Sequence, residues 1–363
     1  MDFSAPLASS APAVSARESH DVRVDVLRGL AALGVALYHF SRSAYLGQGI
    51  TTTILQQGYL GVHAFFVVSG YVIPLALARI AARAKQPFRP RLIPGFLIGR
   101  WIRLYPAFAA SAVLSIVLWY GSALLPGFRG GPPNFSWAQI ASNATLSCDV
   151  FNLAWINPVF WTLAIETQYY VAIALCFPLL VSRHRWLRWS TLLVWIIAPL
   201  LSQTHGTLFP FGATFAVGLI LYGSASELFS KTESAILVIA ALTVTMSHGD
   251  YPVAIAKAVS LLFLCRFPAI KNRWILGLGT VSYSLYLVHV PIGGRVINLS
   301  EHFTLSFPEK LIATFAALIA SIIAAVAFYC YVERPSHEAS RRWMKRHGLP
   351  ANGGEVSSLP ATR

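Results

Sequence analysis

Long apolar runs recur along most of the chain, and they constrain its fold more than any other feature. A helix needs about 20 mainly apolar residues to cross the hydrocarbon core of a bilayer. With 56% hydrophobic and only 12% charged residues among 363, and a mean hydropathy of +0.60, the chain is too apolar for a water-soluble domain. We read ten such runs, at 26–43, 58–78, 104–125, 158–181, 189–203, 208–226, 234–248, 252–267, 275–297 and 309–331.

These runs predict an all-α fold, a polytopic membrane protein of about ten transmembrane helices. The runs at 189–203 and 234–248 are short, so nine or eleven helices also fit the pattern. We assign residues 25–335 to the transmembrane domain and expect residues 1–24 and the basic tail 336–363 to be disordered cytoplasmic segments. No cleavable signal peptide is visible before the first run.

The basic residues predict how the helices are oriented, because Lys and Arg accumulate in cytoplasmic loops. With a cytoplasmic N-terminus, 23 of the 28 basic residues fall on the cytoplasmic side, which places both termini there. The net charge of +14 is then a topology signal and an attraction to anionic headgroups, and nucleic acid is a poor explanation for it. The five basic residues on the other side are Arg42, Arg129, Lys257, Arg295 and Lys310.

The first run carries two polar residues where lipid favours neither. Arg28 and His39 are eleven residues apart, which corresponds to about 16 Å of rise and returns to within roughly 20° of the same direction. They therefore share one face of a helix, and ionisable residues inside a membrane are candidates for function. Arg28 as a residue that snorkels to the headgroups and His39 as a satisfied core histidine are the simpler alternatives.

Two later runs carry charged residues as well. Arg100 and Arg103 in RWIRLYPAF are three residues apart and share a face, either as snorkelling residues or as a phosphate clamp next to Tyr105. Glu166 is the only carboxylate in the core of the longer runs, so it must be protonated, paired or hydrated. It could orient a histidine or accept a substrate hydroxyl.

The ninth run contains His289 just before Pro291, and Pro291 with the glycines that follow is expected to break or kink this helix. In the second run, Ser69 and neighbouring glycines favour close helix packing, and His63 near the outer end is read as interfacial. The ending VERPS places Glu333 beside an arginine, which we read as a structural ion pair.

Taken together, these residues resemble the membrane acyltransferase-3 family, integral-membrane acyltransferases that modify bacterial surface glycans. The resemblance runs from about Asp25 to Pro335. Each motif is weak alone, but six in the proper order are specific. They are Arg28-x10-His39, FFVVSGYVI, RWIRLYPAF, FWTLAIETQYY, SYSLYLVHVP and ERPS.

The resemblance implies a ten-helix, multi-pass domain in the bacterial cytoplasmic (inner) membrane. Such a domain transfers an acyl group, usually acetyl, from cytoplasmic acyl-CoA to a hydroxyl of a cell-surface or exported carbohydrate or glycolipid. Some members carry a fused hydrolase-like domain, of which this sequence shows no trace. Matched by position, His39, Glu166 and Arg28 would be catalytic, Arg100, Arg103 and Tyr105 would bind CoA, and Ser69, Tyr283 and His289 would contact substrate or orient these groups.

The chemistry leaves several alternatives open. We expect His39 to act as the base that deprotonates the acceptor, with a covalent acyl-histidine as a variant. Acyl-CoA is a co-substrate, so no tightly bound cofactor is expected; the four cysteines lack metal-site spacing, so no metal is expected either. The rival functions are a secondary transporter or glycolipid translocator, and a catalytically inactive assembly partner.

Overall fold

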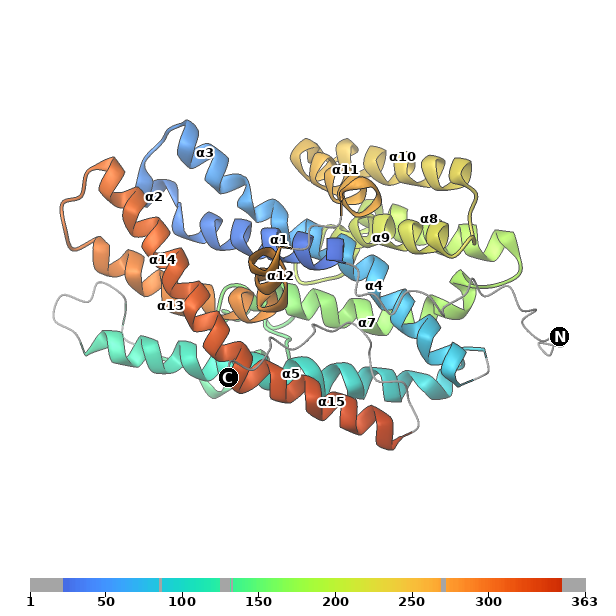
Figure 1. The fold of residues 1–363 in the computed structure, drawn as a ribbon, viewed down its shortest axis with the longest axis horizontal. Coiled ribbons are helices and arrows are strands. Elements are labelled where there is room, and N and C mark those ends of the chain that lie inside the picture. Colours follow the sequence, from blue (N-terminus) through green and yellow to red (C-terminus); the bar gives the residue numbers. More distant parts are fainter. Residues whose placement is uncertain (1–21, 85–86, 125–130, 132, 269–271, 348–363) are drawn as a thin grey trace.

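The structure is a computed structural model that describes residues 22–84, 87–124, 131, 133–268 and 272–347. Of the flanks predicted to be disordered, 1–24 and 336–363, residues 1–21 and 348–363 lie outside the described residues, and 22–24 belong to the first helix. The described residues form helices and connecting turns, with no strand among them. Most helices run along the long axis of the molecule, with α13 beside α14 at one end and α8, α10 and α11 at the other (Figure 1).

Every apolar run predicted from the sequence is occupied by a helix. The helices are α1 (Val22–Phe40), α4 (Gly61–Arg83), α5 (Ile93–Ala123), α7 (Phe160–Leu180), α8 (Arg185–Leu201), α9 (Gly212–Ala225), α10 (Lys231–Ser247), α11 (Tyr251–Arg266), α12 (Arg273–Thr280) with α13 (Ser282–Ser300), and α14 (Phe307–Phe328). Shorter helices are α2 (Ser43–Leu46), α3 (Ile50–Gln56), α6 (Trp137–Ala144) and α15 (Arg334–Arg346).

Four continuous helical stretches in the described residues are long and apolar enough to cross a membrane, and the bent pair α12 and α13 makes a fifth. These are Ile50–Ala82, Pro90–Ala123, Phe160–Leu180 and Phe307–Arg346. The helices α8 to α11 have 14 to 17 residues. At 1.5 Å per residue they measure about 21–26 Å, less than the ~30 Å hydrocarbon core. The fold is therefore that of a helical membrane protein in which four described segments reach spanning length by themselves, and five if the bent pair is one span.

The C-terminal helix extends further than the sequence predicts. The tail was expected to be disordered from residue 336, but α15 continues to Arg346 and packs along α5. The Ser340 hydroxyl donates to the Gly99 carbonyl at 2.7 Å, and Met344 is fully buried against Gly99. These contacts with α5 account for the order of a segment whose own composition is polar.

The glycines of the second run allow close helix packing, as predicted. A Cβ atom added to Gly58 or Gly61 would overlap the backbone of α1 at Gly34 or Ala31. One added to Gly70 would overlap the backbone of α9. Small residues let helix backbones approach in this way, so α4 and the turn before it fit between α1 and α9.

Three apolar clusters hold the described helices together, and α7 belongs to the two largest. The larger cluster joins α7 to α4, α8 and α9, where the rings of Tyr169 and Phe215 stack at 4.0 Å. The second joins α7 to α1, α5 and α13, where Phe108 and Phe160 pack at 4.5 Å. Because α7 lies between the clusters, Glu166 is positioned in the interior of the bundle.

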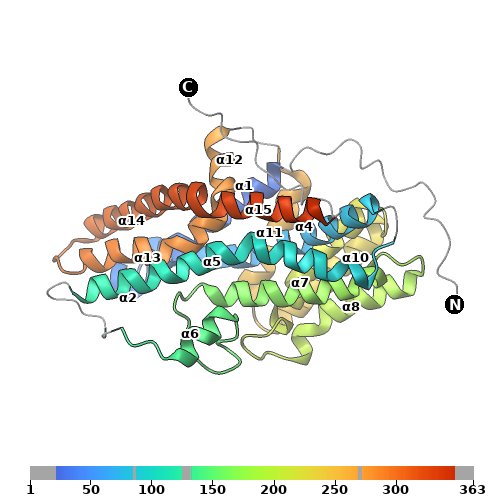
Figure 2. The same cartoon turned by 90° about the horizontal axis from the view of Figure 1, so that it is seen from below.

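Of the break or kink predicted at Pro291, the break is wrong, because α13 runs through the proline from Ser282 to Ser300, while the kink stays a prediction. The chain bends by 71° earlier, at Val281 between α12 and α13, and α12 stands across the other helices (Figure 2). Proline removes the backbone donor to the carbonyl four residues earlier. That carbonyl, of Leu287, instead accepts from Ser111 Oγ at 2.8 Å and Asn157 Nδ2 at 2.9 Å. With the carbonyl satisfied by neighbouring elements, α13 continues through the proline.

Candidate active site

His39 and His289 meet at the C-terminal end of α1. Their ring centroids lie 5.1 Å apart, with the ring planes inclined by 49°. His289 is fully buried, with Nδ1 at 3.0 Å from the Leu285 carbonyl and Nε2 without a hydrogen-bond partner among the described residues. A ring nitrogen that faces a carbonyl must donate, so the neutral ring carries its proton on Nδ1 and presents Nε2 as an acceptor. We call these two residues the histidine pair.

Aromatic rings enclose the histidine pair. The Tyr38 ring lies 5.1 Å from the His39 ring, and the Tyr286 ring lies 5.9 Å from the His289 ring. The hydroxyl of Tyr286 forms a 2.7 Å hydrogen bond with Thr162 of α7. His39 itself is only partly buried, so the pair combines one accessible imidazole with one fixed in the core.

Glu166 accepts two hydrogen bonds from neutral hydroxyls. Ser69 of α4 donates to Oε1 at 2.9 Å, and Tyr170, one turn further along α7, donates to the same oxygen at 2.6 Å. The Arg100 guanidinium lies 5.5 Å from the centre of the Tyr170 ring. The structure thus brings Glu166 together with Ser69 and places it near Arg100 through Tyr170. Its hydrogen-bond partners among the described residues come from α4 and α7, and neither histidine is among them.

A second polar cluster lies where α1, α5, α13 and α15 meet. Glu333 is 2% exposed and accepts from the backbone N–H of Ser284 at 3.1 Å and from the Ser284 hydroxyl. Arg103 Nε donates to His337 Nε2 at 3.2 Å. The same His337 Nε2 lies 3.4 Å from Glu333 Oε1. The positive charges of Arg28 and Arg103 both act on Glu333. We call these five residues the arginine–carboxylate cluster.

The predicted ion pair between Glu333 and Arg334 is therefore wrong. Arg334 pairs instead with Glu338, one turn further on, at 3.3 Å. Glu333 is the last residue of a π-helical turn, Tyr329–Glu333, that joins α14 to α15. Such turns rotate one residue out of the regular helical pattern and occur frequently at functional sites. Here the turn accompanies a carboxylate that faces the interior.

The two predicted CoA-binding arginines lie on α5 with different neighbours. Arg100 is buried, and its Nε has no hydrogen-bond partner among the described residues. Arg103 belongs to the arginine–carboxylate cluster. Tyr283 links this cluster to the centre of the bundle, because its hydroxyl donates to the Leu104 carbonyl at 3.1 Å and it lies within range of the charges of Glu333 and Glu166.

Tyr105 is the one predicted site residue whose hydroxyl binds elsewhere. It donates to the Ala144 carbonyl of α6 at 3.1 Å, and the ring stacks on Trp101 at 4.2 Å. The helix α6, within the segment 126–157, lies below the left end of α7 in Figure 2. Tyr105 therefore anchors this segment.

Sequence reasoning missed several members of these groups. Ser284 and Tyr170 lie within motifs that were recognised, so their positions carried a signal that was not used. His337 follows the last motif, in a stretch predicted to be disordered, and nothing in the sequence pointed to it. Among the residues that the structure describes, no group of three or more His, Cys, Asp or Glu side chains is arranged to hold a metal ion.

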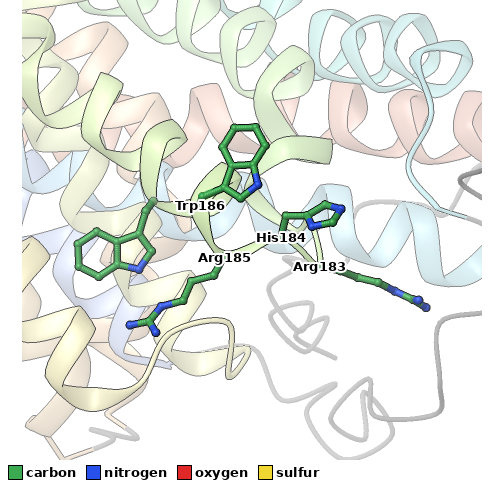
Figure 3. Close-up of a pocket in the computed structure, with 5 residues that line it drawn as sticks. Arg183, His184, Arg185 and Trp186 are labelled. Carbon is green, nitrogen blue, oxygen red and sulfur yellow. The ribbon is translucent and has the colours of Figure 1, made fainter. Parts of the chain in front are cut away.

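A shallow pocket of about 580 Å³ opens at the turn between α7 and α8, apart from these groups (Figure 3). Its lining is basic and aromatic, and it shares no residue with the histidine pair or the arginine–carboxylate cluster. Arg185 and Trp189 each bond Glu233 at 2.8 Å, which fixes one side of it. Its composition fits a membrane interface. The lining residues are Arg183, His184, Arg185, Trp186 and Trp189.

Comparison with known proteins agrees with this arrangement of motifs. A family model described as an acyltransferase domain matches residues 21–330. The chain therefore belongs to the membrane acyltransferase-3 family. No solved structure matches it.

Among characterised relatives, the chain is 30% identical to the O-acetyltransferase OatA of Staphylococcus aureus over 45% of its own length and 25% of that protein. It is similarly 30% identical to the peptidoglycan O-acetyltransferase OatA of Listeria monocytogenes, over 41% of this chain and 22% of that protein. A longer match, 25% identical over 88% of this chain and 83% of the relative, is to BcsY of Komagataeibacter xylinus, provisionally named a membrane-bound transacylase. The matched region thus spans about a quarter of the OatA proteins.

Proposed function

We propose that this protein is a membrane O-acyltransferase that moves an acyl group, in the first instance acetyl, from cytoplasmic acyl-CoA to a hydroxyl of a cell-surface or exported carbohydrate. The histidine pair is the observation that carries the proposal. It supplies His39 as a base, next to the buried His289 that can orient the His39 ring. Family membership and the O-acetyltransferase names of the OatA relatives support it.

In this proposal His39 removes the proton of the acceptor hydroxyl as its oxygen attacks the thioester carbonyl. The carbon–sulfur bond breaks, and the imidazolium of His39 returns the proton to the departing thiolate. Ring centroids 5.1 Å apart are close enough for a hydrogen bond between one nitrogen of each imidazole. His39 would donate to the unpaired Nε2 of His289, which leaves the other nitrogen of His39 to act as the base. An acyl-histidine intermediate on His39 is the alternative route.

The arginines supply the donor side of the proposal. Guanidinium groups bind phosphate oxygens with paired, charge-assisted hydrogen bonds, which suits the phosphates of CoA. Arg100 and Arg103 lie three residues apart on α5, and Arg100 has a buried Nε without a partner among the described residues. Arg28 lies on the same face of α1 as His39, about 16 Å from it along the helix axis. The α1 face would therefore connect donor phosphates with the histidine pair.

We further propose that the ten helical runs form ten spans of the bacterial cytoplasmic membrane, with both termini in the cytoplasm. The distribution of basic residues supports this orientation. The helices shorter than the hydrocarbon core would then require local thinning or snorkelling flanks. Glu166 acts in this scheme by holding the hydroxyls of Ser69 and Tyr170, and Tyr170 in turn lies beside Arg100.

Purified protein tests the proposal directly. Incubation with acetyl-CoA labelled in the acetyl group and an extract of surface glycans should transfer label to carbohydrate, measured by mass spectrometry. His39→Ala should abolish the transfer. His302→Ala, which changes an exposed histidine outside the site, is the matched control and should leave it intact. Transfer that persists in His39→Ala would refute the role given to this residue.

A secondary transporter or glycolipid translocator is the second candidate. The 71° break between α12 and α13 favours it, because broken helices often line transport pathways. Reconstituted vesicles separate the two functions. Counterflow of a glycan or glycolipid without loss of acyl-CoA would support the carrier, whereas acyl-CoA turnover linked to glycan acylation supports the enzyme.

A further inference from the structure

Lys257 is a buried cation outside the groups described so far. It lies on α11 and is 2% exposed, and Nζ donates to the Thr245 hydroxyl of α10 at 2.6 Å. The Thr245 hydroxyl in turn donates to the Ala241 carbonyl at 2.9 Å. An ammonium group has three protons to donate, and no carboxylate of the described residues lies within ion-pair distance of it. Burying an ammonium group without a carboxylate at ion-pair distance is costly, and a bound anion would offset that cost.

His63 on α4 provides a second polar group in the same region. Its Nδ1 is buried without a hydrogen-bond partner in the described part of the chain. The helix α11, which carries Lys257, packs against α4. Lys257 and His63 therefore offer unused donors on two neighbouring helices. We call them the lysine–histidine site.

Neighbouring rings extend from His39 to the turn that precedes His63. The Tyr38 ring lies 5.1 Å from the His39 ring, and the Tyr59 ring lies 6.0 Å from the Tyr38 ring. Tyr59 belongs to the 3₁₀ turn Gln57–Leu60, which leads directly into α4, and His63 lies in the first turn of α4. The helix α11 also packs directly against α1 and α4. His39 and the lysine–histidine site therefore lie on three helices that contact one another.

We propose that Lys257 and His63 bind the anionic group, a carboxylate or a phosphate, of an acidic carbohydrate acceptor whose hydroxyl is presented to His39. The inference rests on the proposed function and narrows its acceptor to acidic glycans or glycolipids. An oxyanion has lone pairs for the remaining ammonium protons and for the His63 ring, and it supplies the missing counter-charge. Lys257 is also one of the few basic residues that the predicted topology leaves on the outer side, where exported carbohydrate is handled.

Binding measurements on the purified full-length chain test this without requiring turnover. The probes are methyl β-D-glucuronide for the carboxylate, glucose 6-phosphate for the phosphate, and methyl β-D-glucoside as the neutral analogue. We expect the wild-type protein to bind at least one anionic probe about tenfold more tightly than the neutral one, the gain typical of a charge-assisted hydrogen bond. The anionic probe that shows the preference identifies the group. Equal binding of all three probes would overturn the proposal.

The variants locate the effect. Lys257→Met keeps the length of the side chain and should remove the anion preference, whereas Lys257→Arg should keep most of it. Lys231→Met, at an exposed position, is the control and should change nothing. If Lys257→Met does not yield monodisperse protein, His63→Phe decides instead: a preference reduced several-fold supports the site, and an unchanged preference refutes it.

The same set separates this inference from the proposed function. Lys257-dependent binding of an anionic probe by a protein that never transfers acyl groups would uphold the site and refute the acyltransferase. Acyl transfer that proceeds equally to neutral and acidic acceptors, and is unaffected in Lys257→Met, would uphold the acyltransferase and refute the lysine–histidine site.

Discussion

The rings of His39 and His289 lie 5.1 Å apart although one belongs to α1 and the other to α13. The hydrogen bond at Nδ1 fixes the tautomer of His289, and its burial fixes the ring. His39 is the accessible member of the pair. This asymmetry supports our proposal that His39 is the reactive residue and that His289 positions it.

The two histidines should therefore respond differently to substitution. Loss of a general base costs about 10²–10⁴-fold in rate, and we expect a fall in kcat of that size for His39→Ala. His289→Phe preserves a buried ring but removes Nε2, and should lower kcat on the order of tenfold, the worth of one hydrogen bond. The pH dependence of kcat/KM should also shift in His289→Phe. A variant with an unchanged pH profile would show that His289 only fills space.

The buried carboxylate of the arginine–carboxylate cluster should matter for stability. Glu333→Gln keeps the shape of the side chain but leaves the charges of Arg28 and Arg103 without their nearby anion. Hydrogen bonds to a charged group contribute about 1.5–3 kcal/mol, and the loss of the carboxylate that accepts from Ser284 should lower the stability by an amount in that range. Unfolding of the purified protein in detergent measures it.

The control for this experiment lies one helical turn along the chain. Glu338 pairs with Arg334 at a half-exposed position, and Glu338→Gln should change stability by less than about 0.5 kcal/mol. Equal losses of stability in Glu338→Gln and Glu333→Gln would contradict the prediction that the buried carboxylate matters more.

The two side-chain donors to the Leu287 carbonyl, which Pro291 leaves without a backbone donor, should contribute to stability. Ser111→Ala or Asn157→Ala alone leaves one donor on this carbonyl, and each should cost about 1 kcal/mol. The double variant leaves a buried carbonyl without any donor, so its loss should exceed the sum of the single losses. Thermal unfolding of the four proteins forms a double-mutant cycle. Purely additive losses would mean that water or a backbone shift satisfies the carbonyl.

The helix positions could be predicted from the sequence because apolar composition is a local property, and each predicted run holds a helix. The continuity of α13 through Pro291 could not be predicted, because the donors that satisfy the Leu287 carbonyl come from α5 and from the segment before α7. The ion pair of Glu333 with Arg334 was an avoidable error, since adjacent residues on a helix point in different directions. The order of α15 depends on its contact with Gly99 of α5, which no local pattern encodes.

The candidate site divides in the same way. Helical geometry alone placed Arg28 and His39 on one face of the first helix. The meeting of His39 with His289, and of Glu166 with Ser69, depends on how distant helices pack. Lys257 was visible only as an exception to the distribution of basic residues, and its burial and lack of a carboxylate partner could be seen only in the folded chain.

A pH-dependent contribution to stability is expected at the start of α10, outside the apolar runs. The backbone N–H of Ser230 and the indole of Trp189 donate to the Glu233 carboxylate, and together with Arg185 they lower its pKa from 4.5 to about 2. A carboxyl group whose pKa is depressed by folding stabilises the protein above its unfolded pKa. This stabilisation is lost as the pH falls from about 4.5 towards about 2.

The melting temperature of the wild type should therefore drop more steeply than that of Glu233→Gln between about pH 5 and about pH 3, where this loss begins. Parallel curves for the two proteins would show that Glu233 contributes no such linkage, and Glu227→Gln, at another carboxylate in the turn before α10, should follow the wild type.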